Sequence, residues 1–257
     1  MRELVENDRI IGGMTEGCAE RAEAVYRLFP RGNLFCTDAP TAELVKLVEN
    51  AFRDVNIVFA NELSLICDQV GLDVWSVIEL ANRHPRVSIL RPGAGVGGHC
   101  IAVDPWFIIS AAPERSRLMR VAREVNDAKP KFIVKQILER AERFKRPVIA
   151  CLGVTYKADV DDTRESPAIE IARQLARSSQ ECILIADPEL RVLPEELAGF
   201  SNVTFCDTLD AVRQADIVAI LVAHSSFRKI PRDDLIRRVV IDATGLMHEY
   251  GGIRAAL

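Results

Sequence analysis

The sequence predicts an α/β protein in which a central helical region is followed by a Rossmann-like, doubly wound parallel-sheet domain. From Arg146 onward, short β-branched runs alternate with amphipathic segments, which is typical of parallel strands covered by helices on both faces. The middle third of the chain carries long apolar patterns of helical type. A length of 257 residues is comfortable for two domains, each with its own core.

The first 38 residues predict a strand, a helix and a strand, in NDRIIGG, TEGCAERAEAVYRLF and NLFCTD. This order is unusual for the start of a doubly wound domain. We therefore interpret residues 1–38 as the remnant of a preceding domain.

Residues 39–144 form the predicted central region, which begins with one long helix. Asp38 and Pro40 supply start signals, and Gly71 supplies a stop. Apolar residues cover most of the circumference of this helix, which predicts a homodimer built on it from about Pro40 to Val70. A short helix over VWSVIELANR follows, and then a long helix from about Arg115 to Phe144, broken near Pro130.

Residues 145–257 form the predicted parallel-sheet domain. Strands are expected at PVIACLGV, CILIAD, IVAILVA and VVIDAT, and helices at PAIEIARQLAR and LDAVRQAD. We find no internal repeat and no low-complexity segment.

Composition excludes several classes of partner. The net charge is −4 and the pI is about 5.7, with scattered basic residues, so we expect a small-molecule partner and no nucleic acid. No apolar run is long enough to span a membrane, and the first residues are too charged for a signal peptide, so a cytoplasmic protein is expected. Seven cysteines without a CxxC pair argue against disulfides and zinc, and most should be buried.

The stretch RPGAGVGGHCIAVDP contains G-x-G-x-x-G at Gly93, Gly95 and Gly98. A dinucleotide fingerprint needs a strand before the glycines and a helix after them, whereas Pro92 precedes and Pro105 follows. We therefore interpret the stretch as a thiol loop. Its nucleophile would be Cys100, tuned by its sequence neighbours His99 and Asp104. The alternative is a buried cysteine in a tight loop. A lone histidine without ligand spacing does not predict a metal site.

Lys46 and Asn50 stand four residues apart on the long helix and so share a face. A lysine in apolar surroundings can exchange protons or stabilise an oxyanion, and the asparagine can hold a water or hydroxyl. The alternative, favoured by spacing alone, is that Lys46 reaches solvent and pairs with Glu43 or Glu49.

Two further segments concentrate charge. In YKADVDDTRESPA, Lys157 and Arg164 precede a predicted helix N-terminus at Ser166 and Pro167, which suits a phosphate. A capped helix with solvated, paired charges is equally consistent with the spacing. In ANRHPR, Arg83, His84 and Arg86 are concentrated just before the glycine loop, and a solvated charged turn is the alternative interpretation of them.

Taken together, GVGGHCIAVDPWF, ANRHPR and DDTRESPA resemble the nucleotide-sugar 6-dehydrogenases, the family of UDP-glucose and GDP-mannose dehydrogenases. The residues of these motifs are most similar to those of the branch that oxidises UDP-N-acetyl-D-mannosamine. The resemblance covers essentially the whole chain and implies an NAD-dependent, two-step oxidation of the sugar C6 hydroxyl. It also implies a dinucleotide-binding domain with its own fingerprint before the first residue, so we expect about 150 residues or more of the family pattern to be absent here.

The resemblance implies roles for individual residues. Cys100 would form a thiohemiacetal and then a thioester, while Lys46, Asn50 and Asp104 would position water and stabilise charge on the reacting oxygen. Lys157 would bind the diphosphate, and Arg164 and Gly98 would approach NAD. Substrate contacts, some in a neighbouring subunit, would come from Arg83, His84, Arg86, Arg91 and Gly97.

Two departures argue against UDP-glucose as the substrate. UDP-glucose members carry a lysine where this chain has Val103 and an arginine near the last strand where it has Thr244. The family's catalytic glutamate has no counterpart in the chain. The alternatives are another nucleotide-sugar 6-dehydrogenase and a non-catalytic sugar-nucleotide-binding or dimerisation module without a cofactor domain.

Overall fold

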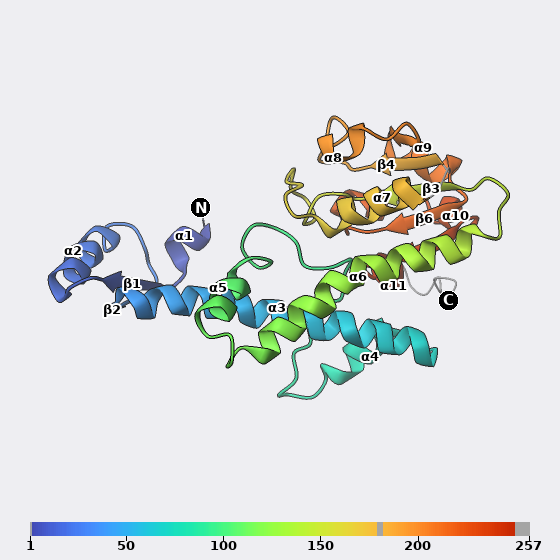
Figure 1. The fold of residues 1–257 in the computed structure, drawn as a ribbon. Helices are drawn as coiled ribbons and strands as arrows, with labels where there is room; N and C mark the ends of the chain where they lie inside the picture. The colour runs from blue at the N-terminus through green and yellow to red at the C-terminus, as the bar shows by residue number, and fades with distance from the viewer. Residues whose placement is uncertain (1, 179–181, 250–257) are drawn as a thin grey trace. The chain divides into compact units, whose positions relative to one another are not determined.

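The computed structural model describes residues 2–178 and 182–249 (Figure 1). The chain forms two units that divide after Phe52. The first unit, Met1–Phe52, contains α1 (Arg2–Glu6), β1 (Arg9–Gly13), α2 (Glu16–Tyr26), β2 (Leu34–Asp38) and the beginning of α3. Strands β1 and β2 pair in parallel, and the side chain of Thr15 caps α2. The predicted order of strand, helix and strand is confirmed.

Helix α3 (Ala39–Val70) begins and ends where the sequence predicts. Its start is fixed by Asp38, whose carboxylate accepts the Thr41 N–H at 2.9 Å. It ends before Gly71, which adopts a φ of +71°, the left-handed conformation that glycine favours after a helix.

The second unit, Arg53–Leu257, contains the rest of α3, α4 (Val74–Ala81), α5 (Asp104–Ala111) and α6 (Arg117–Ala141). The predicted break near Pro130 is wrong, because α6 continues through that residue. A proline removes one helical hydrogen bond, at a cost of about 3 kcal/mol. Burial of Ile133, Val134 and Ile137 against the sheet, one turn later, outweighs this cost.

The parallel-sheet prediction is confirmed. Strands β3 (Val148–Leu152), β4 (Cys182–Ala186), β5 (Val203–Phe205), β6 (Ile217–Ile220) and β7 (Val239–Asp242) are all parallel, in the order β5-β4-β3-β6-β7. The remaining helices are α7 (Pro167–Ser178), α8 (Glu195–Ala198), the 3₁₀ helix η1 (Ser225–Lys229), α9 (Thr208–Gln214), α10 (Arg232–Ile236) and α11 (Leu246–Glu249). Strand β5, a run of only three residues, was not predicted.

Apolar clusters cover both faces of this sheet. On β3, Ile149 and Cys151 belong to a core shared with α6 and α7, whereas Ala150 and Leu152 belong to a core shared with α9 and α10. The chain order reverses between β3 and β6, which lie at the centre of the sheet. Ligands of such sheets bind beyond the carboxyl ends of the strands at this reversal.

The prediction that most cysteines are buried is wrong. Only Cys67 and Cys151 are buried among the seven, and Cys18, Cys36 and Cys182 are exposed. Cys18 and Cys36 belong to the first unit, where few side chains are covered. No helix in the described part of the chain is both long and apolar enough to cross a membrane.

Candidate functional site

Two buried asparagines hold the loop that precedes Cys100. Asn61 on α3 accepts the Gly93 N–H at 2.8 Å, and Asn126 on α6 accepts the Val96 N–H at 2.6 Å. Sequence reasoning missed both residues; Asn61 is a polar side chain in a largely apolar part of α3, whereas Asn126 lies among charged residues that give no such signal. Because buried amides need partners, the two side chains fix the loop to the helices on either side.

The glycines of this loop allow it to pack against the loop between β3 and α7. A Cβ on Gly97 would lie 2.4 Å from the Glu165 carbonyl oxygen, and one on Gly98 would lie 2.9 Å from the Tyr156 ring. Gly98 also has a φ of +85°. The glycines therefore permit contact between two segments of the same protein.

The described structure agrees with our interpretation that G-x-G-x-x-G is not a dinucleotide fingerprint, since no strand directly precedes it. One detail requires correction. A helix does follow the stretch, because α5 begins at Asp104, with Pro105 in its first turn. Asp104 is thus the first residue of a helix and not a loop residue.

Cys100 is half-buried, so its thiol is neither enclosed in a core nor fully exposed. Its sulfur lies 3.1 Å from Nδ1 of His99, close enough for a hydrogen bond. The Cys100 carbonyl accepts the N–H of Asp104 at 2.8 Å, which ties the thiol residue to the start of α5. The structure therefore brings Cys100, His99 and Asp104 together in one turn of chain.

Arg164 lies close to this turn and is paired with Asp162. Its Nε donates to both carboxylate oxygens, at 2.9 and 3.1 Å, and Nη2 donates at 2.5 Å. Hydrogen bonds from Arg164, with a smaller electrostatic contribution from His99, lower the pKa of Asp162 to about 2. The pKa of Arg164 is raised, mainly by Asp162 and to a lesser degree by Cys100.

The neighbouring predicted phosphate ligands have different surroundings. The Lys157 side chain is exposed. Ser166 is buried, and its hydroxyl donates to the Thr155 carbonyl at 3.1 Å while accepting the Ile169 N–H at 3.5 Å. This geometry agrees with the alternative of a capped helix at Ser166, whereas Lys157 keeps its ammonium group available to an anion.

Lys46 and Asn50 belong to the first unit. Lys46 is exposed and lies 3.2 Å from Glu49, the pairing that its spacing favoured. Asn50, in contrast, is 1% exposed. The buried-lysine interpretation is therefore wrong for this chain by itself, because an exposed ammonium group is hydrated and paired.

The basic residues before the glycine loop are solvent-facing. Arg83 pairs with Glu79 at 3.1 Å, and Nδ1 of His84 accepts the Arg86 N–H at 3.3 Å. Arg91 lies over the Trp75 ring at 5.5 Å from its centroid. Within this chain, Arg83, His84 and Arg86 form the solvated turn that we gave as the alternative.

Comparison with known proteins places these features in a family. Residues 40–128 match the central domain of the UDP-glucose/GDP-mannose dehydrogenase family, and residues 150–249 match its UDP-binding domain. The two matches together take in well over half of the chain, which belongs to this family.

Two curated relatives and one solved structure are similar to most of the chain. The NDP-N-acetyl-D-galactosaminuronic acid dehydrogenase of Ralstonia solanacearum is 58% identical over 96% of this chain and 57% of its own length. The UDP-N-acetyl-D-mannosamine dehydrogenase of Campylobacter jejuni is 50% identical over 92% of this chain and 58% of its own. The structure of a UDP-D-ManNAc dehydrogenase from Pyrococcus horikoshii matches with a TM-score of 0.85, at 40% identity over 95% of this chain and 58% of that one.

The chain thus spans somewhat more than half of the length of these relatives. Two glycines of the loop before Cys100, Gly97 and Gly98, are packed against Glu165 and Tyr156, so they do not cradle a pyrophosphate from this side.

Proposed function

We propose that this chain supplies the UDP-sugar-binding and thiol-bearing part of an NAD-dependent dehydrogenase. The enzyme would oxidise the C6 hydroxyl of UDP-N-acetyl-D-mannosamine to the uronate. The supporting observation is the contact between the two loops, which brings the half-buried Cys100 close to Arg164 on the segment that also carries Lys157. NAD would accept the hydrides, held by polypeptide beyond the residues described here.

The chemistry proposed for Cys100 starts from the C6 aldehyde. The thiolate sulfur bonds to C6 while the carbonyl π electrons move to oxygen, which takes up a proton. After oxidation of this thiohemiacetal to a thioester, water adds to the carbonyl carbon and the C–S bond breaks. The products are the carboxylate and a free thiol. His99, 3.1 Å from the sulfur, can take the thiol proton at the start.

Asp104 would orient the water that attacks the thioester, since it lies at the start of α5 beside Cys100. Lys46 and Asn50 would stabilise charge on the reacting oxygen, a role that rests on the family resemblance. Lys157 would bind the diphosphate with its exposed ammonium group. Arg164 and Gly98 would lie on the cofactor side, and Gly97 and Arg91 on the substrate side.

A homodimer built on α3 is part of the proposal. Exposed apolar residues recur along this helix at intervals of four and seven, at Leu44, Val48, Phe52, Phe59, Ile66 and Val70. A second copy of the helix would remove this stripe from water. Arg83, His84 and Arg86 would then face the substrate of the neighbouring subunit. Light scattering at micromolar concentration should give a dimer mass, and a monomer mass would contradict the proposal.

The second candidate substrate is a nucleotide-linked N-acetyl-D-galactosamine. It is favoured by the 58% identity to the Ralstonia relative, which exceeds the 50% identity to the Campylobacter one. Competition between the two nucleotide sugars for the same chain would separate these candidates. A cytoplasmic location remains a prediction from the sequence.

The decisive experiment joins this chain to the N-terminal segment that the Ralstonia relative has and this chain does not match. We expect the chimera to reduce NAD with a UDP-sugar and to form the uronate. The chain alone should reduce no NAD. Cys100→Ser should stop formation of the acid, because a serine hydroxyl is much harder to ionise near neutral pH than a thiol.

Cys206→Ser is the matched control, since Cys206 is also free and half-buried but follows β5. It should leave the rate unchanged. Uronate formation at the parental rate by Cys100→Ser would contradict the role of the thiol. A chimera that binds the UDP-sugar but never reduces NAD would favour the non-catalytic module.

A further inference from the structure

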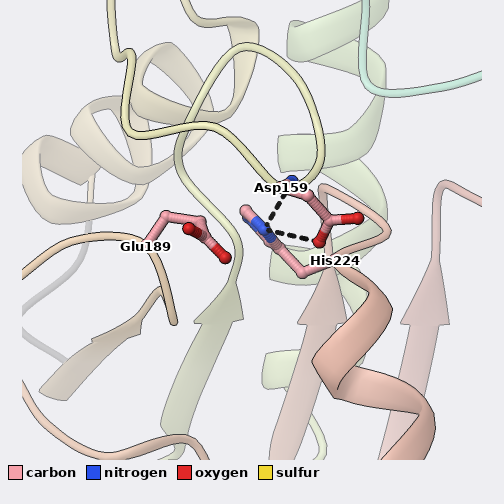
Figure 2. A group of neighbouring side chains, drawn as sticks. All are labelled: Asp159, Glu189 and His224. Carbon is pink, nitrogen blue, oxygen red and sulfur yellow. Dashed lines mark hydrogen bonds and ion pairs between the residues drawn. The ribbon is translucent and has the colours of Figure 1, made fainter.

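His224 is fully buried just beyond the carboxyl end of β6, and both nitrogens of its ring are engaged. Nε2 lies 3.2 Å from a carboxylate oxygen of Asp187 and 3.1 Å from the Thr155 hydroxyl oxygen. Nδ1 accepts the backbone N–H of Asp159 at 3.1 Å. Figure 2 shows the ring standing between Asp159 and Glu189. Neither the sequence analysis nor the proposed chemistry uses this histidine.

The partners of the ring determine where its proton lies. Burial opposes ionisation of Asp187, but hydrogen bonds from His224 and the Val154 N–H outweigh it and hold the pKa of Asp187 below its ordinary value. A carboxylate can only accept, so Nε2 must carry the proton. Nδ1 then has the lone pair that the Asp159 N–H requires. Nε2 therefore donates to the Asp187 carboxylate, while Nδ1 accepts from the Asp159 backbone.

The hydrogen bonds that connect His224 to Asp187, Thr155 and Asp159 form a network, and its bonds to the backbone lie on both sides of Lys157 in the chain. On the N-terminal side, Asp187 accepts the N–H groups of Val154 and Thr155, at 2.7 and 3.1 Å. The Thr155 hydroxyl donates to the Lys157 carbonyl at 3.0 Å. The backbone of Lys157 is thereby tied to the network through Thr155.

On the C-terminal side, Asp159 is bound twice. Its N–H reaches His224, and its carboxylate accepts the N–H and the hydroxyl of Ser225 at 2.9 and 3.0 Å. Asp159 has a φ of +60°, a left-handed conformation that Asp adopts more readily than most residues but that still costs more free energy than it would for glycine. The bonds to His224 and Ser225 offset this cost, so the path of the chain around Lys157 depends on them.

The same side chains could also bind a divalent cation. One ligand atom each from Asp159, Glu189 and His224 lie within 4.8 Å of one another. However, the lone pair of Nδ1 is already taken by the Asp159 N–H, and one Asp159 carboxylate oxygen accepts both bonds from Ser225. His224 would have to give up its bond to the Asp159 N–H before Nδ1 could hold an ion. The arrangement thus favours an anchor for the loop over a metal site.

We propose that His224 is a positioning residue that fixes Lys157 for diphosphate binding, acting through its bond to the Asp159 N–H. This inference rests on the proposed function, in which Lys157 binds the diphosphate. Lys157 is exposed, so its direction depends on the backbone on either side. A flexible loop would have to be ordered when the ligand binds, and this ordering would weaken the affinity.

Two substitutions of His224 test the roles of Nε2 and Nδ1 separately. His224→Gln places an amide nitrogen near the position of Nε2 and keeps the bond to Asp187, but it provides no acceptor for the Asp159 N–H. His224→Asn places an amide oxygen near the position of Nδ1 and keeps that acceptor, but it loses the bond to Asp187. His248→Gln, at a half-exposed histidine on α11, is the matched control.

Each variant of the whole chain should be titrated with UDP by calorimetry, and exchange of the Asp159 amide hydrogen should be followed in the same samples. We expect His224→Gln to lose about tenfold or more in UDP affinity and to lose protection of the Asp159 amide. We expect His224→Asn to stay within about threefold of the parent, and His248→Gln to match it.

Parental UDP affinity and amide protection in His224→Gln would overturn the inference while leaving the proposed function intact. The inference would also be overturned if His224→Asn lost affinity as much as His224→Gln, or if zinc bound the parent tightly and raised its melting temperature. If the parent itself bound no UDP, the proposed function would fail. Loss of Asp159 protection in His224→Gln alone would then still support the anchoring role of His224.

Discussion

The two parallel sheets of this protein are covered to very different extents. In the second unit, the residues of β3, β4 and β6 are almost all buried, with apolar clusters on both faces. In the first unit, Ile10 on β1 is 44% exposed and Phe35 on β2 is 54% exposed. Parallel sheets are normally covered on both faces. The difference indicates that the first unit presents apolar surface suited to further polypeptide, which supports the proposed cofactor-binding partner segment.

The largest expected difference between the two units is the loss in the free energy of unfolding when an ion pair is broken. Arg123 and Asp54 are 4% and 0% exposed and lie 2.8 Å apart in the second unit. Burial, opposed by Arg123, raises the pKa of Asp54. Arg123→Met would leave the carboxyl group buried without its partner, so we expect a loss of about 3–5 kcal/mol in the free energy of unfolding. Urea denaturation measures this loss.

The control for this experiment is Arg27→Met in the first unit. Arg27 lies 2.5 Å from Glu23, but its side chain is 69% exposed. We expect a change of no more than about 0.5 kcal/mol, since water solvates both partners after the substitution. Equal losses in the two variants would contradict the contrast in coverage.

A pair of core truncations sharpens the same comparison. Ile185→Ala removes a fully buried side chain from β4 and should cost about 2–5 kcal/mol. Phe35→Ala removes a larger side chain from β2, yet it should cost less than about 1 kcal/mol, because that ring is already half in water. Both values come from urea denaturation. A larger loss for Phe35→Ala than for Ile185→Ala would show that the first unit is covered after all.

The smallest effect concerns a buried lysine. Lys129 is 6% exposed and donates to the Ser64 hydroxyl at 2.6 Å, and burial lowers its pKa to about 8. Because the unfolded chain has the ordinary pKa of 10.5, it binds the proton more readily. Lys129 therefore lowers stability below pH 8, and this cost disappears as the pH rises toward 10.5.

Lys129→Met should accordingly stabilise the protein by about 1–3 kcal/mol at pH 7, and the gain should shrink toward pH 10.5. Lys46→Met, at an exposed position of the first unit, should give no comparable gain. Thermal denaturation across this pH range tests both variants. A gain from Lys129→Met that stayed constant with pH would contradict the account.

Much of the fold could be predicted because the patterns are strong. The alternation after Arg146 identifies the parallel sheet, and Asp38 and Gly71 mark the ends of α3. The helix break at Pro130 was wrong because local sequence does not reveal the packing that stabilises α6 on both sides of the proline. Strand β5 was missed because three residues are too few to show a period.

The site could be predicted where its reactive side chains lie within a few residues of one another in the sequence. Cys100, His99 and Asp104 are neighbours in sequence, and the structure keeps them together. Contacts between distant segments could not be predicted. Nothing near Asn126 in the sequence points to residue 96, and Asp187 and His224 meet only because β4 and β6 flank β3. A polar residue directly after a buried strand, as at Asp187, is the signal that could have identified the second pair.

The most direct test of the central claim is a calorimetric titration of this chain with UDP-N-acetyl-D-mannosamine, using the parent, Lys157→Ala and Lys145→Ala. Both lysines are exposed, but only Lys157 lies on the loop between β3 and α7. The account predicts saturable binding by the parent, a loss of about tenfold or more in Lys157→Ala, and parental affinity in Lys145→Ala. No binding by the parent, or equal affinity in all three proteins, would contradict it.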